Sequence, residues 1–227
     1  MVELIAGLDA ERVRANLGRI RGEIEAAAQR GIAAGTRTHA GVEILAATKY
    51  VALEDMPLLY EGGIRLVGEN RAQDLERKIA VHGELFEWDF IGQLQSRKVR
   101  TILPNVRLIH SVASDSALTA LERYRELARP DLGILIQVNI AGEPGKAGIA
   151  PNELGAFLEH APVPVRGLMG MPPVAHDPQD SRQWFAALRK LANQHGLEQL
   201  SMGTTQDYDV AVEEGATTVR IGTRLYA

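Results

Sequence analysis

The stretch from residue 200 to residue 223, LSMGTTQDYDVAVEEGATTVRIGT, holds two short β-rich runs with a helical segment between them. The first run leads into Gly203 and the second into Gly222. Segment 207–214 has helical spacing and is followed by Gly215, a residue typical of the position just after a helix. Because a strand, a helix and a second strand in succession join parallel neighbours, this stretch predicts a βαβ unit.

The same alternation extends along the rest of the chain. Eight β-rich runs are expected to form strands: 42–48, 64–68, 88–91, 107–112, 133–140, 165–169, 199–202 and 218–221. Segments with helical periodicity fill the seven gaps between them: 53–61, 71–82, 95–103, 116–127, 153–160, 178–195 and 207–214. Ahead of the first run, a further amphipathic helix is predicted by the spacing of Val13, Leu17, Ile20 and Ile24.

Eight β/α units favour a closed (β/α)8 TIM barrel with an additional N-terminal helix, in a single domain spanning residues 1–227. Several of the predicted strands are apolar on both faces, as strands covered on both sides are. An open doubly wound sheet would need a glycine-rich turn after its first strand. Segment 46–50, AATKY, stands there instead.

Composition excludes several classes of protein. The 227 residues include no cysteine, so disulfides, thiolate metal sites and a cysteine nucleophile are ruled out. A net charge of −4 and 5% aromatic residues argue against a nucleic-acid-binding surface. No apolar run reaches the length that spans a membrane, and no targeting signal is visible. We expect a cytoplasmic protein that binds neither nucleic acid nor membrane.

The loops after the seventh and eighth predicted strands are candidates for a phosphate site. In (β/α)8 barrels the active site lies at the carboxyl ends of the strands, and phosphate often binds after strands seven and eight. Both loops carry glycine and hydroxyl side chains, at 203–205 and at 222–223. Backbone N–H groups and hydroxyls of this kind cradle phosphate. The alternative is that Gly203 and Gly222 serve only the turns.

Lys49 is expected at the end of the first strand, which neighbours the eighth strand in a closed barrel. A partly desolvated lysine beside a phosphate site suits a Schiff base with a phosphorylated carbonyl compound. Two ligand classes remain open from the residues alone: a sugar phosphate, as in lysine aldolases, and pyridoxal 5′-phosphate. Arg220 could contact the ring nitrogen of the latter.

Several segments together resemble a known family. They are AATKY around Lys49, VGENRAQDLERK from Val67, WDFIGQLQSRK from Trp88, IHSVAS from Ile109, QVNIAGEPGKAGI from Gln137, GLMGMPP from Gly167, LSMGTTQDYDVAVEEGATTVRIGT from Leu200, and the final RLYA. The chain is similar to the pyridoxal phosphate homeostasis proteins, single-domain proteins that resemble the N-terminal barrel of alanine racemase.

The resemblance implies that Lys49 carries pyridoxal 5′-phosphate as a covalent aldimine. It implies a contact from Arg220 to the pyridine nitrogen and a nearby polar contact from Asn70. The phosphate contacts that it implies are Ser201, the Met202 backbone, Thr205, Gly222 and Thr223. The chain departs from the family pattern at Asp89, Gln93, Thr204 and the final Tyr226-Ala227. We expect these departures to affect the rim and the partner surface.

Members of this family are regarded as cofactor carriers or regulators of vitamin B6 and amino-acid pools, with no established turnover. Arg220 agrees with such a role, because a charged guanidinium cannot accept a proton from a pyridinium nitrogen. The ring nitrogen is then left unprotonated, and the ring is a poor electron sink. The chain also ends just after the eighth strand, leaving no length for a second domain like that of the racemases. We therefore expect a non-catalytic binding protein.

Two enzyme functions stay open as alternatives: a pyridoxal-phosphate-dependent racemase of low activity, and a Schiff-base aldolase. The expected partners are pyridoxal phosphate and recipient apo-enzymes. A monomer is expected, because no large exposed apolar stripe remains once the helices and strands are assigned.

Overall fold

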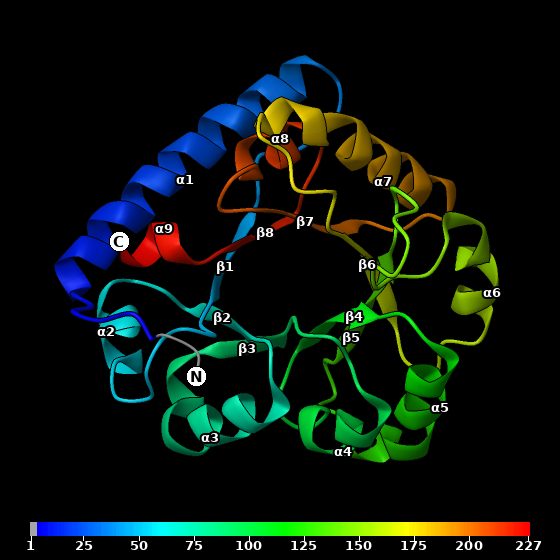
Figure 1. The fold of residues 1–227 in the computed structure, drawn as a ribbon, viewed down its shortest axis with the longest axis horizontal. Coiled ribbons are helices and arrows are strands. Elements are labelled where there is room, and N and C mark those ends of the chain that lie inside the picture. Colours follow the sequence, from blue (N-terminus) through cyan, green and yellow to red (C-terminus); the bar gives the residue numbers. More distant parts are fainter. Residues whose placement is uncertain (1–3) are drawn as a thin grey trace.

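A computed structural model describes residues 4–227, which form a closed barrel of eight parallel strands paired in the order of the sequence. The strands are β1 (Glu43–Ala47), β2 (Leu66–Glu69), β3 (Glu87–Phe90), β4 (Leu108–Val112), β5 (Gly133–Val138), β6 (Val165–Gly170), β7 (Gln199–Thr204) and β8 (Thr218–Ile221). Figure 1 shows them around the centre with the helices outside. The predicted barrel is confirmed; the predicted domain also includes residues 1–3, which lie outside the described residues.

The helices follow the strands as the periodicity predicts. They are α1 (Ala10–Ala33), α2 (Met56–Glu61), α3 (Ala72–His82), α4 (Val99–Ile102), α5 (Asp115–Tyr124), α6 (Leu154–Glu159), α7 (Arg182–Gln194), α8 (Tyr208–Glu213) and α9 (Thr223–Tyr226). Several predicted helices are partly 3-10, as at Ser96–Lys98 before α4 and Pro178–Ser181 before α7. The short helix α9 was not predicted, because four residues carry no periodic signal.

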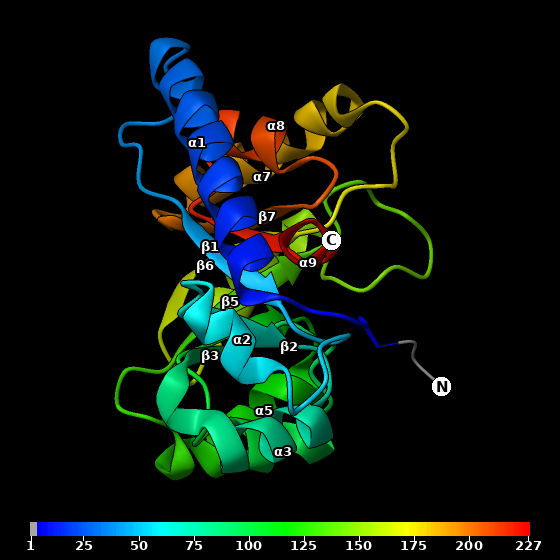
Figure 2. The same ribbon diagram turned by 90° about the vertical axis from the view of Figure 1, so that its left-hand side faces the viewer.

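Helix α1 precedes the barrel and packs against α2, α8 and α9 (Figures 1 and 2). The Asp9 side chain caps its first turn by accepting a hydrogen bond from the Arg12 amide at 2.8 Å. The predicted apolar stripe is buried in the core, at Val13, Leu17, Ile20 and Ile24. Within residues 4–227, no helix has the length and apolar character needed to cross a membrane.

The pairing of β1 with β8 closes the barrel. Four consecutive pairs join the two strands, ending with Leu45 opposite Arg220 and Ala46 opposite Ile221. Lys49 lies shortly after the end of β1, and Gly222 directly follows β8. The closure therefore brings Lys49 and the loop after β8 to the same end of the barrel, as the sequence predicts.

The close packing of β6 against β7 leaves no room for a side chain at Gly167. A Cβ atom there would lie 1.8 Å from the carbonyl oxygen of Gln199 in β7, and backbone cannot move aside without breaking the pairing. Gly167→Ala should lower the free energy of unfolding by about 3 kcal/mol or more, measured by urea denaturation. The matched control is Gly155→Ala in α6, where the nearest atom is 3.9 Å away. It should raise stability by up to about 1 kcal/mol; equal effects of the two substitutions would contradict the close approach.

Candidate functional site

A cavity of about 310 Å³ opens at the carboxyl ends of β1, β7 and β8. This is the end of a (β/α)8 barrel at which active sites lie. Its lining consists of Ala47, Lys49, Tyr50, Asn70, Ile91, Met171, Thr204, Thr205, Gln206, Arg220, Gly222 and Thr223. The volume lies within the range of about 300–1,000 Å³ that small-molecule sites have.

Six of the eight residues predicted to form the site line this cavity: Lys49, Asn70, Thr205, Arg220, Gly222 and Thr223. Ser201 and Met202 do not belong to its lining. Both are buried in the middle of β7, upstream of the cavity wall. The roles assigned to all eight from the family resemblance stay predictions.

Lys49 is exposed at the mouth of the cavity. Its Nζ lies 4.6 Å from the centre of the Tyr50 ring, a cation–π distance. No carboxylate of residues 4–227 forms a salt bridge with this amine. The amine is therefore held near the cavity without a counter-ion to occupy it.

The backbone before Lys49 is fixed by a buried ionic pair that the sequence reading missed. Lys78 of α3 donates from Nζ to Oε1 of Glu69 at 2.5 Å and to the Thr48 carbonyl oxygen at 2.8 Å. The Thr48 hydroxyl donates to the same Glu69 oxygen at 2.7 Å. Lys78 and Glu69 are almost fully buried, and a buried charge is stable only when paired in this way. The pair ties the ends of β1 and β2 together beneath Lys49.

Asn70 presents an unsatisfied acceptor. Its Oδ1 is buried and has no hydrogen-bond partner among residues 4–227, although the residue lines the cavity. Buried polar atoms are almost always hydrogen-bonded, because leaving one unpaired costs about 1–3 kcal/mol. The atom is suited to accept a hydrogen bond from a ligand.

Arg220 presents unused donors. Its Nη1 donates to the carbonyl oxygen and the Oγ of Ser201 at 2.8 and 2.5 Å, and its Nη2 donates to the Gly170 carbonyl oxygen at 3.1 Å. A guanidinium has five N–H donors, so in the described part of the chain one on Nη2 and the one on Nε have no partner. Burial lowers the pKa of Arg220 to about 10, so the group remains charged at neutral pH.

The two loop glycines have different roles. Gly203 has a positive φ of 87°, and a Cβ there would lie 2.5 Å from the Ala211 Cβ, so this glycine serves the turn and the packing of α8. At Gly222 an added Cβ would lie 3.9 Å from Ala47, an ordinary van der Waals contact, so packing does not require a glycine at this position of the cavity lining. The Gly222 amide donates to the Thr205 hydroxyl at 3.2 Å and joins the two loops.

Two longer loops stand at the rim of the same end. Figure 2 shows the loop after β5, in green, and the loop after β6, in yellow, on the side of the carboxyl terminus. Lys146 of the first loop donates to the Pro172 carbonyl oxygen of the second at 3.0 Å and pairs with Glu143. The loops are therefore held together beside the cavity mouth.

Asp89 was expected at the rim, and this expectation is wrong. It lies within β3 and its side chain is fully buried in the barrel interior. There it accepts hydrogen bonds from Nε and Nη2 of Arg107 at 3.0 and 3.3 Å and from Nε2 of His110 at 3.1 Å. The strand continues through Phe90, so the side chain of Asp89 points inward rather than into a loop.

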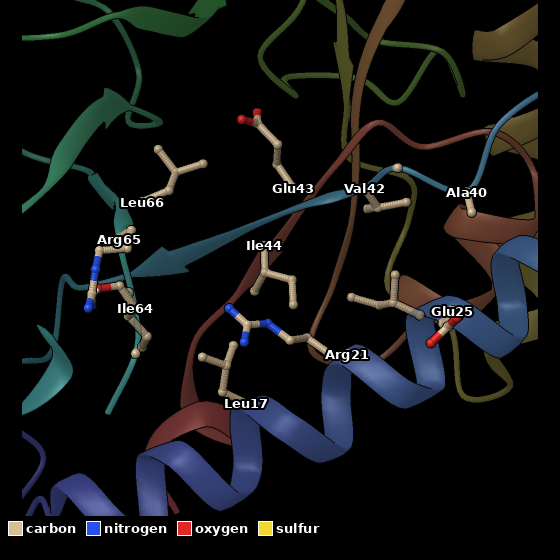
Figure 3. A pocket seen from close by; sticks show the side chains of 13 residues that line it. Leu17, Arg21, Glu25, Ala40, Val42, Glu43, Ile44, Ile64, Arg65 and Leu66 are labelled. Atoms are coloured by element: carbon tan, nitrogen blue, oxygen red, sulfur yellow. Dashed lines mark hydrogen bonds between the residues drawn. The ribbon is translucent and has the colours of Figure 1, made fainter. Parts of the chain in front are cut away.

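A larger hollow of about 560 Å³ lies at the amino ends of β1 and β2. Figure 3 shows Leu17 and Arg21 projecting from α1 toward Ile44. Its lining mixes apolar side chains with charged ones that include Arg21 and Glu25, and it is at the opposite end from the predicted site residues. Residues 4–227 also contain no group of three histidine or acidic side chains that could hold a metal ion. The cavity at the carboxyl ends is therefore the candidate site.

Comparison with known proteins shows the family to which this chain belongs. The family model for the alanine racemase N-terminal domain matches residues 9–227. The pyridoxal phosphate homeostasis protein of Aquifex aeolicus is 37% identical over 195 residues, which cover 81% of this chain and 86% of the relative. This chain belongs to the pyridoxal phosphate homeostasis protein family.

Solved structures of similar proteins have the same fold as this chain. PipY of Synechococcus elongatus PCC7942, solved with pyridoxal phosphate bound, is 32% identical and has a TM-score of 0.75; the match covers 88% of this chain and 100% of that chain. Alanine racemase of Corynebacterium glutamicum has a TM-score of 0.70 at 15% identity, with 100% of this chain and 63% of that chain covered. At 15% identity the likeness to alanine racemase concerns the fold alone. It confirms the predicted barrel, which resembles the N-terminal domain of the racemase.

The buried His110 gives a prediction for pH dependence. Burial lowers its pKa from the ordinary 6.5, so the ring stays neutral in the folded protein while the unfolded chain takes up a proton below that pH. Because the unfolded state then binds more protons, stability should fall as the pH drops below about 6.5, by at most about 1.4 kcal/mol per pH unit.

Urea denaturation at a series of pH values between about 5 and 8 measures this dependence. The exposed His160 is the control, because His160→Gln should leave the slope unchanged while His110→Gln reduces it. A free energy of unfolding that does not change between about pH 7 and 5 would argue against a neutral, buried His110.

Proposed function

We propose that this protein binds pyridoxal 5′-phosphate in the cavity at the carboxyl ends of β1, β7 and β8, as a Schiff base on Lys49. It would carry or buffer the cofactor in vitamin B6 and amino-acid homeostasis, in the cytoplasm, with recipient apo-enzymes as partners. The observation that carries this proposal is one cavity lined by three groups that lack partners among residues 4–227: the Lys49 amine, two donors of Arg220 and the Asn70 acceptor.

The residues present fit this cofactor group by group. The Lys49 amine would bind its aldehyde carbon, and an unused N–H of Arg220 would donate to its ring nitrogen. The hydroxyls of Thr205 and Thr223 and the backbone of Gly222 suit its phosphate. Ser201 and Met202 complete the predicted set. When bound, such a cofactor stabilises negative charge on a substrate carbon to the extent that its ring withdraws electrons.

Two features favour a binding protein over an enzyme. Arg220 is charged and can only donate, so it leaves the ring nitrogen without a proton and the ring a weak electron sink. Racemisation also needs acid–base groups on opposite faces of the substrate. The titratable side chains lining the described cavity are Lys49, Tyr50 and Arg220, and Tyr50 lies against Lys49 rather than facing it.

The absorption spectrum tests the proposal. Purified protein incubated with pyridoxal phosphate should show the visible band of a lysine Schiff base, and borohydride should fix the group on the peptide that contains Lys49. Lys49→Ala should abolish the band without changing the unfolding midpoint, because the side chain is exposed. Lys190→Ala, which removes an exposed lysine of α7, is the matched control and should keep the band. A native protein that stays colourless would refute the proposal.

Exchange of the α-proton separates the binding protein from the low-activity racemase. In deuterated solvent, alanine and serine incubated with the loaded protein should exchange negligibly at the α-carbon, because no acid–base pair spans the described cavity. Robust exchange that disappears in Lys49→Ala would support the racemase instead. The aldolase alternative requires a protein that needs no pyridoxal phosphate, so a colourless native protein that cleaves sugar phosphates would favour it.

A further inference from the structure

A chain of hydrogen bonds crosses the barrel interior and ends on Arg220. His110 of β4 contacts Asp89 of β3 through Nε2 at 3.1 Å and Ser201 of β7 through Nδ1 at 2.8 Å. Ser201 Oγ in turn accepts from Nη1 of Arg220 at 2.5 Å. Because β4 and β7 are not neighbours in the barrel, the bond between His110 and Ser201 must pass through its interior.

We propose that Asp89, His110 and Ser201 are positioning residues, which hold Arg220 and determine where its free donors point. This inference rests on the proposed function, since it concerns the group that would meet the ring nitrogen of the cofactor. None of the three lines the cavity, so each would act through Arg220 rather than by touching the cofactor.

The Asp89 carboxylate determines which atom donates and which accepts in every hydrogen bond of the chain. The Asp89 carboxylate faces Arg107 and can only accept, so His110 must donate to it from Nε2. A neutral His110 ring then has a lone pair on Nδ1, which accepts the hydroxyl hydrogen of Ser201. With its hydrogen directed to His110, the Ser201 oxygen is left to accept from Arg220.

The negative charge of Asp89 forms an ion pair with Arg107 and not with Arg220. Arg107 is the charged side chain that pairs with Asp89, and it also pairs with Glu43 at the amino end of β1 at 2.8 Å. Within residues 4–227, Arg220 is held only by neutral oxygens, those of Ser201 and Gly170. No carboxylate of the described residues contacts the Arg220 guanidinium, which lines the cavity. A ligand atom with a lone pair would therefore be favoured beside it.

The same chain gives Ser201 a role different from the one that the family resemblance implies. Its oxygen accepts from Arg220 and its hydrogen goes to His110, so no donor remains for a phosphate. Its side chain is fully buried in β7, upstream of the hydroxyls of Thr204 and Thr205 that line the cavity. We assign Ser201 to Arg220, which leaves the phosphate to the residues at the cavity wall.

A binding cycle tests the assignment, with Ser201→Ala as the variant and Ser111→Ala as the matched control. Ser111 is also a buried serine, but it lies in β4 and donates to the Gly92 carbonyl oxygen without contacting Arg220. Each protein is titrated with pyridoxal phosphate and with the analogue that has C–H in place of the ring nitrogen. Urea denaturation reports whether each variant is folded.

We expect Ser201→Ala to weaken binding of pyridoxal phosphate about tenfold or more, since a hydrogen bond to a charged group is lost. The analogue should bind Ser201→Ala and the native protein alike, because the contact that Arg220 makes is already missing. Ser111→Ala should bind both compounds as the native protein does. Equal weakening for both compounds, or none for either, would overturn the positioning role. Failure of the native protein to bind pyridoxal phosphate would instead refute the proposed function.

The direction of the chain can be measured without any cofactor. Nitrogen NMR of the ¹⁵N-labelled protein distinguishes the two neutral forms of a histidine ring. The proton of His110 should reside on Nε2, with Nδ1 unprotonated, near neutral pH. A proton on Nδ1 would reverse the bond to Ser201 and overturn the assignment even if the cofactor binds. Because this readout reports a bond direction, a merely space-filling His110 would not account for it.

Discussion

The pairing of β1 with β8 is the constraint on which the candidate site depends. Closure of the barrel converts two segments at opposite ends of the sequence into neighbours, with Leu45 opposite Arg220. Lys49 follows the one strand and Gly222 the other, so both residues line one cavity. The pairing is itself covered by α1, which packs over α8 and α9 on the outside (Figure 1). An open sheet with the same strands would leave these groups at its two edges.

Two ionic clusters, each built on a fully buried carboxylate, hold the groups around the cavity. Lys78 and Glu69 hold the backbone before Lys49, and Arg107 and Asp89 begin the chain that ends on Arg220. Each cluster pairs its own charges within the barrel, which a buried charge requires. The cationic groups that face the cavity, Lys49 and Arg220, are left without contacting carboxylates in the described structure. The barrel thus neutralises charge in its interior and leaves positive charge at its carboxyl end, where an anionic ligand would bind.

Much of the fold was predictable because its signals are local and repeated. The strand at 218–221 and the helical segment before it have the predicted periodicity, and their places in the structure agree within a residue or two. The positions of Lys49 and Thr205 at the cavity were predictable, because each follows a predicted strand and the carboxyl ends of parallel strands meet at one end of the barrel. Asp89 was misplaced although the predicted strand 88–91 contains it, because the segment WDF does not show that Arg107 and His110 bind its carboxylate inside the barrel. The bond that gives His110 a partner comes from β7, far away in the sequence.

The sequence by itself determined the order of the elements, the closed barrel, the family, and the set of residues at the carboxyl ends of the strands. It could do so because periodicity, strand ends and family motifs are properties of short segments. Only the tertiary structure decided which groups are paired and which are free. It separated the turn glycine Gly203 from Gly222, bonded Ser201 to Arg220, and left the Asn70 acceptor without a partner in the described part of the chain. Hydrogen-bond satisfaction depends on contacts between strands distant in sequence, and such contacts exist only once the barrel has closed.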